Sequence, residues 1–397
     1  MQQSSLIFRI LAVFSQLLQG KGHEQMFGPM VAAPFILLPY TYFIHPKGFK
    51  VAVYASIACW ILIILVMTWR VFRLVRSVVI DPTFGDPQAK HLAKLLSEQR
   101  GEEILSLLSQ IRNQERRVFL FSQIREIQGR PNWIEELTKN HWDSAEAHLI
   151  SGNHAIGWAW QARGAGDAES VQKDSWAIFF DRLTLAEKLL IRATELDSSD
   201  PLPWASLIIV SRGLEQGMEV HQEYFEEVTR RDPFHFDAHS MYLQAICKKW
   251  GGSHEEMFEF ARNASAKAPK GSPIHLLVPI AHIERWMEGF EDIKPEMRDS
   301  YFSQPEVLQE IKDSADKTIF STEWDPQTPE TKAENIFAFL FWLSGSTLKA
   351  KKAFDKIGTK PCSFPWEYYQ LGWESAFDYA RKECSKPLIS KEEIELT

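Results

Sequence analysis

Two histidines in the string HFDAH are the residues best suited to hold a metal ion. His235 and His239 are four residues apart, so on a helix their imidazoles lie one turn apart and can chelate a transition ion. Asp237 lies between them in the chain but points to a different helical face. Two ligands do not complete a site, so we expect no bound metal and interpret both histidines as solvent-facing or capping residues.

Motifs for other catalytic chemistry are missing from the sequence. It has no phosphate-binding loop, no Gly-x-Ser-x-Gly elbow, no dinucleotide fingerprint and no His-Glu-x-x-His zinc helix. The four cysteines are far apart and have no Cys-x-x-Cys spacing. We therefore expect no cofactor and lean against an enzyme. The alternative is an enzyme with an unrecognised site in the helical region around residues 154–180.

Tryptophan and arginine side chains are the better candidates for contacts with a partner. The string WAWQARG, residues 158–164, belongs to a group of aromatic residues that includes Trp176 and Phe179. We interpret this group as core packing, with part of a ligand groove as the alternative. For partner binding we select four residues that line or border a groove, each with a purely structural role as its alternative: Trp158, Arg163, Arg212 and Trp250.

The most distinctive string, CKKWGGSHEEMFEFAR at residues 247–262, predicts a turn followed by a capped helix. Gly251 and Gly252 permit a sharp turn, Ser253 can cap the next helix, and Glu256 completes a capping box. Trp250 then anchors the turn. The string holds no pair of nucleophile and base, so we expect a structural role for it.

Helical patterns dominate after residue 90, and no sustained alternating strand pattern occurs, so we predict an all-α fold. Three prolines, Pro201, Pro233 and Pro269, are 32 and 36 residues apart and each follows a helical stretch. The residues eight and five positions before each proline are apolar: Ala193, Phe225, Ala261, Leu196, Val228 and Ala264. These columns are similar to the tetratricopeptide pattern, in which helix pairs stack into an α-solenoid and share one core.

Charge divides the chain into two regions. Residues 1–80 hold seven Lys or Arg and one acid, which is a net charge of +6. Because the net charge of the whole chain is −8, residues 81–397 have a net charge of −14. An acidic domain of this size repels phosphate backbones, so we expect no nucleic-acid partner. The same balance favours a basic segment as the partner.

Two apolar stretches near the N-terminus predict a transmembrane hairpin. Residues 26–44 and 51–69 each run for 19 residues without a charge, which is about 28 Å of helix against a hydrocarbon core of about 30 Å. Three prolines in the first stretch leave open that it re-enters the bilayer without crossing it. Three arginines follow the second stretch, which favours placing the large domain in the cytoplasm. Residues 1–25 have the spacing of an amphipathic helix, with a short core helix as the alternative.

The strings at residues 158–164, 186–201 and 249–262 together resemble a family of uncharacterised bacterial proteins with a tetratricopeptide-like helical domain. The resemblance covers roughly residues 130–360 and implies a fold but no reaction. The membrane hairpin lies outside it, so the prediction of membrane attachment depends on the apolar stretches alone.

From these features we predict a membrane-anchored helical-repeat scaffold that binds a protein or peptide partner. A third possibility is that the hairpin itself acts with other membrane helices. The apolar stretches and the arginines that follow them predict a location in the inner, cytoplasmic membrane with the soluble domain in the cytoplasm, and the resemblance implies a bacterial source. The predicted organisation is an amphipathic segment (1–25), a hairpin (26–79), a linker (80–90), a tetratricopeptide-like domain (91–385) and a polar tail (386–397).

Overall fold

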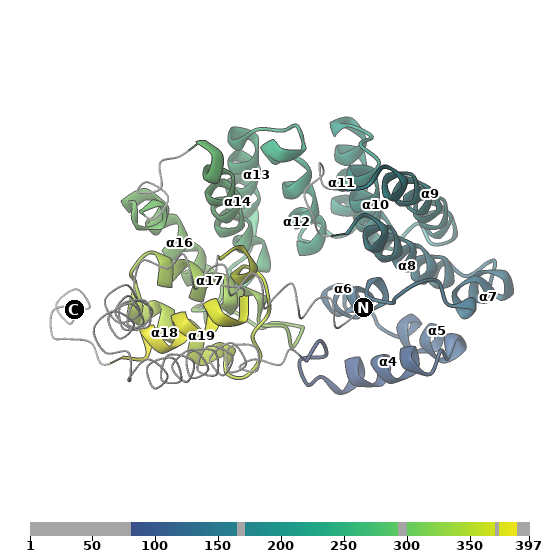
Figure 1. Ribbon diagram of the computed structural model, residues 1–397, viewed down its shortest axis with the longest axis horizontal. Helices are drawn as coiled ribbons and strands as arrows, with labels where there is room; N and C mark the ends of the chain where they lie inside the picture. The colour runs from purple at the N-terminus through teal and green to yellow at the C-terminus, as the bar shows by residue number, and fades with distance from the viewer. Residues whose placement is uncertain (1–80, 165–170, 293–299, 370–372, 387–397) are drawn as a thin grey trace, which may run out of the picture. The chain divides into compact units, whose positions relative to one another are not determined.

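The computed structural model describes residues 81–164, 171–292, 300–369 and 373–386. Within these ranges there are fifteen α-helices and no β-strand, which confirms the all-α prediction (Figure 1). None of the helices in these ranges is long and apolar enough to cross a membrane. The predicted segment 1–25 and the predicted spans 26–44 and 51–69 lie outside the described residues.

Contacts between Cα atoms divide the chain into two compact units, residues 80–362 and residues 1–79 with 363–397. The first unit holds the following α-helices: α4 (Pro87–Ser97), α5 (Gly101–Ser109), α6 (Gln114–Arg125), α7 (Asn132–Asn140), α8 (Ala145–Arg163), α9 (Lys173–Leu196), α10 (Pro201–Gly213), α11 (Met218–Arg231), α12 (Phe236–Ala245), α13 (His254–Lys267), α14 (Leu277–Asp292), α16 (Pro305–Lys317), α17 (Lys332–Leu343) and α18 (Thr347–Ile357). Short 3-10 helices lie between them: η3 (Lys248–Trp250), η4 (Pro273–Leu276) and η5 (Tyr301–Ser303).

Successive helices of this unit pack on one another. Helix α8 lies along α9, α10 contacts α9, α11 and α12, α13 contacts α14, and α17 contacts α18. Helix α8 also contacts α6 and α10, although another helix lies between each pair in the chain. This packing is compatible with a helical-repeat domain.

The three spaced prolines each follow a helix, as the sequence predicts. Pro201 comes after α9 and begins α10, while Pro233 and Pro269 lie just after α11 and α13. None of the six residues in the two apolar columns is exposed, and Ala193, Val228 and Ala261 are fully buried. A proline has no backbone donor and fits the first turn of a helix or the chain beyond its end, which explains these positions.

The turn before α13 has the predicted construction. Gly251 has a φ of +97°, and a Cβ on Gly252 would lie 2.0 Å from the carbonyl oxygen of Ile246, so neither position accepts a larger residue without movement. Ser253 Oγ accepts from the backbone N–H of Glu256 at 3.1 Å and donates to the Glu256 carboxylate at 2.8 Å. The serine cap and its glutamate partner are therefore confirmed, with the hydroxyl rather than a backbone N–H donating to the carboxylate.

The second unit contributes η6 (Trp366–Tyr368) and α19 (Trp373–Cys384) to the described residues. Its buried Trp366 meets Phe377 edge-on, with the ring centroids 5.3 Å apart. This aromatic contact joins the short helix to α19.

Candidate partner-binding groove

The predicted aromatic group forms around the end of α8. Trp160 and Trp176 both contact the buried Phe179 edge-on, at 5.0 and 5.7 Å between ring centroids. The guanidinium of Arg163 lies 5.4 Å from the centroids of Trp160 and Trp176, and its Nη1 donates to the carbonyl of Gly164 at the helix end. These contacts are cation–π and helix-end interactions within the fold.

Trp158 lies on the same helix and contacts two other arginines. The guanidinium carbon of Arg182 is 3.7 Å from its ring centroid and that of Arg130 is 5.6 Å away. Arg182 also donates to the backbone carbonyl of Trp158 at 2.6 Å. Trp158 therefore packs against arginines of the chain itself, and a role in contacting a partner stays a prediction.

Arg212 and Trp250, selected separately from the sequence, contact one another. The Arg212 guanidinium carbon is 5.3 Å from the Trp250 ring, and burial lowers the pKa of Arg212. None of the four selected residues lines the acidic groove described below, which is built from other segments. Their proposed partner contacts remain predictions.

The two histidines of HFDAH are buried, so the expectation of solvent-facing rings is wrong, whereas that of capping is confirmed for His235. His235 Nδ1 accepts from the backbone N–H of Ala238 and caps α12. His239 Nδ1 lies 2.9 Å from the carbonyl oxygen of His235, to which it donates. Each ring thus binds the backbone through Nδ1, and the described residues hold no group of three or more potential ligands for a metal.

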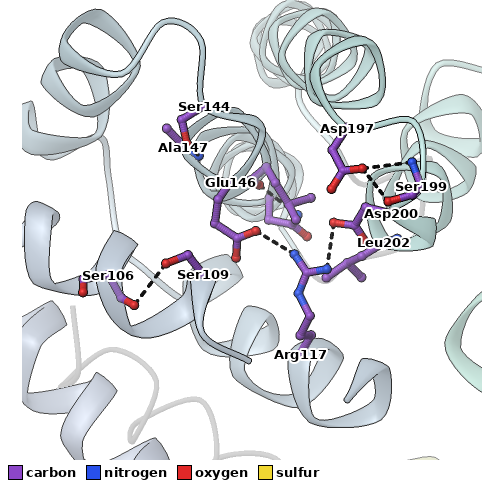
Figure 2. Close-up of polar contacts among 12 residues, drawn as sticks. Ser106, Ser109, Arg117, Ser144, Glu146, Ala147, Asp197, Ser199, Asp200 and Leu202 are labelled. Carbon is purple, nitrogen blue, oxygen red and sulfur yellow. Dashed lines mark hydrogen bonds and ion pairs between the residues drawn. The ribbon is translucent and has the colours of Figure 1, made fainter. Parts of the chain in front are cut away.

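A charged cluster is buried between α6, α8 and the start of α10. Arg117 lies between two carboxylates, 2.7 Å from Glu146 and 2.7 Å from Asp200 (Figure 2). Asp200 also caps α10 by accepting from the N–H of Leu202. Burial raises the pKa of Glu146. At Arg117 burial acts to lower the pKa, but the two neighbouring carboxylates outweigh it, so the pKa of Arg117 is raised. All three charges interact with each other, so we interpret this cluster as a structural link between helices.

A second polar network links α13, α14, η5 and α16. His282 contacts Tyr301 Oη through Nδ1 and Glu310 through Nε2, both at 2.8 Å, and Arg262 forms two hydrogen bonds to Glu310. The hydrogen bond from His282 and the Arg262 guanidinium lower the pKa of Glu310 to about 2. Burial raises the pKa of Tyr301 well above its ordinary value, so its hydroxyl is a poor nucleophile.

A groove of about 650 Å³ lies where four segments far apart in the sequence meet. One wall runs along α6 and its cap, residues 113–125, and the others are residues 232–237, 269–276 and 323–333. Gly271 brings two of these segments close together, because a Cβ there would lie 2.2 Å from the carbonyl oxygen of Glu323. The groove thus lies within the compact unit of residues 80–362.

The lining of the groove is acidic. It includes three cationic side chains, Arg125, Lys270 and Lys332, against twice as many carboxylates: Glu115, Asp232, Asp237, Glu323, Asp325 and Glu330. Burial raises the pKa of Glu115, and the nearby charges of Asp232 and Asp325 raise it further. A positive ligand in the groove would relieve this repulsion.

Three polar atoms of the groove lining are buried without a hydrogen-bond partner in the described structure: His235 Nε2, Asp237 Oδ2 and Gln114 Oε1. His235 is only 4% exposed. Because its Nδ1 accepts the capping N–H, the neutral ring carries its proton on Nε2, which is therefore a donor. Buried polar groups without partners are rare in folded proteins, and such groups can be satisfied by a ligand.

Around residues 154–180, where the alternative prediction places an enzyme site, the described residues form no catalytic cluster. His154 is buried and its Nε2 contacts the carbonyl of Gly129 at 2.8 Å, while burial lowers the pKa of the ring. Residues 165–170 lie outside the described part of the chain.

The fold therefore defines an all-α protein of packed helices with an acidic groove. In comparisons with known proteins, no family model matches the chain, and no curated protein or solved structure matches it significantly.

Proposed function

We propose that this protein is a membrane-anchored helical-repeat scaffold that binds an extended segment of a protein partner in the acidic groove. The observation that carries this proposal is the set of partnerless buried atoms in the groove lining, above all His235 Nε2. A peptide backbone offers carbonyl acceptors and N–H donors at regular intervals, which suits such a lining.

Two further features support the proposal. A domain of stacked helix pairs exposes extended surfaces that suit peptide binding, and the tetratricopeptide-like columns favour this architecture. The uncharged stretches 26–44 and 51–69 favour a tether that holds the domain at the cytoplasmic face of the inner membrane. With the groove built only from residues 113–333, the tether and the binding surface are separate parts of the chain.

The test of the groove is selection of binders from a random 12-residue peptide display library on the full chain in nanodiscs. Ser122 lines the groove, is exposed and donates to a carbonyl three residues earlier, so Ser122→Trp fills the groove without disturbing the core. Ser109 makes the same local bond on exposed α5 surface away from the groove, so Ser109→Trp is the matched control (Figure 2).

We expect selected peptides to lose at least 10-fold in affinity on the Ser122→Trp chain and to keep their affinity on Ser109→Trp. Peptides that bind all three chains equally would overturn the groove proposal. The tether is tested by carbonate extraction of membranes: the full chain should stay in the pellet, and a chain lacking residues 1–79 should be released. Release of the full chain would contradict the membrane anchor.

A further inference from the structure

Resting on the proposed function, we propose that the groove selects its partner through an arginine side chain, whose guanidinium lies among Glu115, Asp232 and Asp325 beside the ring of Phe234. This names the chemistry of the occupant, an extended peptide segment that carries arginine. The charge of the lining, its aromatic surface and its buried donor all favour this occupant.

The three carboxylates line the same groove, and none of them pairs with a cation in the described part of the chain. Asp232 and Asp325 both act on Glu115, which accepts a hydrogen bond from the backbone of Gln327. In the described part of the chain no Lys or Arg forms an ion pair with any of the three. Elsewhere in the same unit, carboxylates such as Glu146 and Glu310 are neutralised by arginines of the chain itself. These three carboxylates thus lack a paired cation, which a partner can supply.

The apolar surface of the groove suits a guanidinium. Phe234 is 40% exposed, which is high for a phenylalanine, and it follows Asp232 closely in the chain. A flat, weakly hydrated guanidinium can stack on such a ring while its N–H groups reach two carboxylates. Lys332 already lies 5.9 Å from the neighbouring ring of Phe236, which shows that a cation is accommodated in this part of the lining.

The buried donor fits the peptide that carries the arginine. His235 Nε2 is buried at the groove, has no partner, and holds a proton because Nδ1 accepts the cap of α12. A backbone carbonyl of the peptide can accept this N–H, which removes the cost of leaving the donor unpaired. A metal ion is the poorer occupant, since no three potential ligands converge in the described residues.

The test uses the full chain and three synthetic probes, read by fluorescence anisotropy. The first is fluorescein-Gly-(Ser-Arg-Leu)₃-amide; in the second citrulline replaces each arginine, and in the third lysine does. Citrulline keeps the shape of arginine and removes its charge. We expect the arginine probe to bind at least 10-fold more tightly than the citrulline probe, with the lysine probe between them.

The matched variant is the double substitution Glu115→Gln with Asp325→Asn, which removes two charges and keeps the side-chain size. It should weaken the arginine probe at least 10-fold and leave the citrulline probe within 2-fold, while thermal unfolding shows that the chain remains folded. Glu306→Gln with Asp313→Asn, two exposed acids of α16 outside the groove, is the control and should leave the arginine probe unchanged.

The outcomes separate this inference from the proposed function. Equal binding of the arginine and citrulline probes, both blocked by Ser122→Trp, would overturn the arginine inference and leave the peptide groove in place. Binding of the arginine probe that ignores Ser122→Trp would overturn both. Binding that the control pair of substitutions weakens as much as the groove pair would show attraction by overall charge only, and would overturn the arginine inference.

Discussion

The Arg117 cluster and the acidic groove place carboxylates in opposite situations. At Arg117, the carboxylates of Glu146 and Asp200 both lie 2.7 Å from one guanidinium, and Asp200 also caps α10. In the groove, the charges of Asp232 and Asp325 act on Glu115, and none of the three carboxylates forms an ion pair in the described structure. The comparison indicates that charge at Arg117 serves the fold, whereas charge in the groove remains available to a partner.

The largest effect should come from breaking the compensated cluster. Arg117→Met leaves Glu146 and Asp200 buried beside one another, and we expect a loss of about 3–5 kcal/mol in the free energy of unfolding. Urea denaturation followed by circular dichroism measures it. Arg100→Met is the control, because Arg100 pairs with Glu98 and Glu103 at the surface, where solvent screens the pairs, so its effect on stability should be far smaller. Equal losses in the free energy of unfolding for the two variants would contradict a special role of the Arg117 cluster in stability.

An intermediate effect is expected at Glu310, whose partners are internal but which is 32% exposed. Glu310→Gln should cost about 1–2 kcal/mol at pH 7, since solvent screens part of its interaction with Arg262 and His282. The pKa of Glu310 is lowered from 4.5 to about 2, so the stabilisation is present above pH 4.5 and is lost as the pH falls toward 2.

Urea denaturation at pH 7 and pH 3 checks this prediction, with Glu306→Gln on the same helix as the control. A difference between wild type and Glu310→Gln that grows as the pH falls from 7 to 3 would contradict the sign.

The smallest effect, and one of opposite sign, is expected in the groove. Glu115→Gln removes a partly buried charge that Asp232 and Asp325 repel, so it should stabilise the free protein by about 0.5–1 kcal/mol at pH 7. The pKa of Glu115 is raised above 4.5, so the penalty of its charge exists at high pH and disappears below pH 4.5. The gain from Gln should therefore vanish at pH 4, as urea denaturation at the two pH values would show.

Loss of stability in Glu115→Gln at pH 7 would mean that this carboxylate has an internal role like that of Glu146. The groove would then no longer differ from the Arg117 cluster in the way described.

Features set by neighbouring residues were predictable from the sequence. The all-α fold follows from apolar periodicity, and the turn at Gly251 and Gly252 with its Ser253 cap follows from local backbone chemistry. The grouping of Trp160, Trp176 and Phe179 was likewise predicted from nearby positions.

The groove was not predictable in this way, because its walls come from residues as far apart as Asn113 and Ala333. Its signal in the sequence was limited to a run of acids and prolines at 323–330, which has no regular helical pattern. The burial of His239 was missed for a related reason, since a histidine at a helix start is compatible with either solvent or core. Phe225 and Phe260, which surround the His239 ring, lie on other helices.

The assembly of the groove from distant segments has a consequence for biosynthesis. During translation the α6 wall leaves the ribosome first, and the wall formed by residues 323–333 is synthesised some two hundred residues later. A nascent or prematurely ended chain that stops before residue 323 lacks one side of the groove, although many of its helices can already pack. The groove is therefore present only in a finished domain, and a partner that binds it would be recruited only by completed chains.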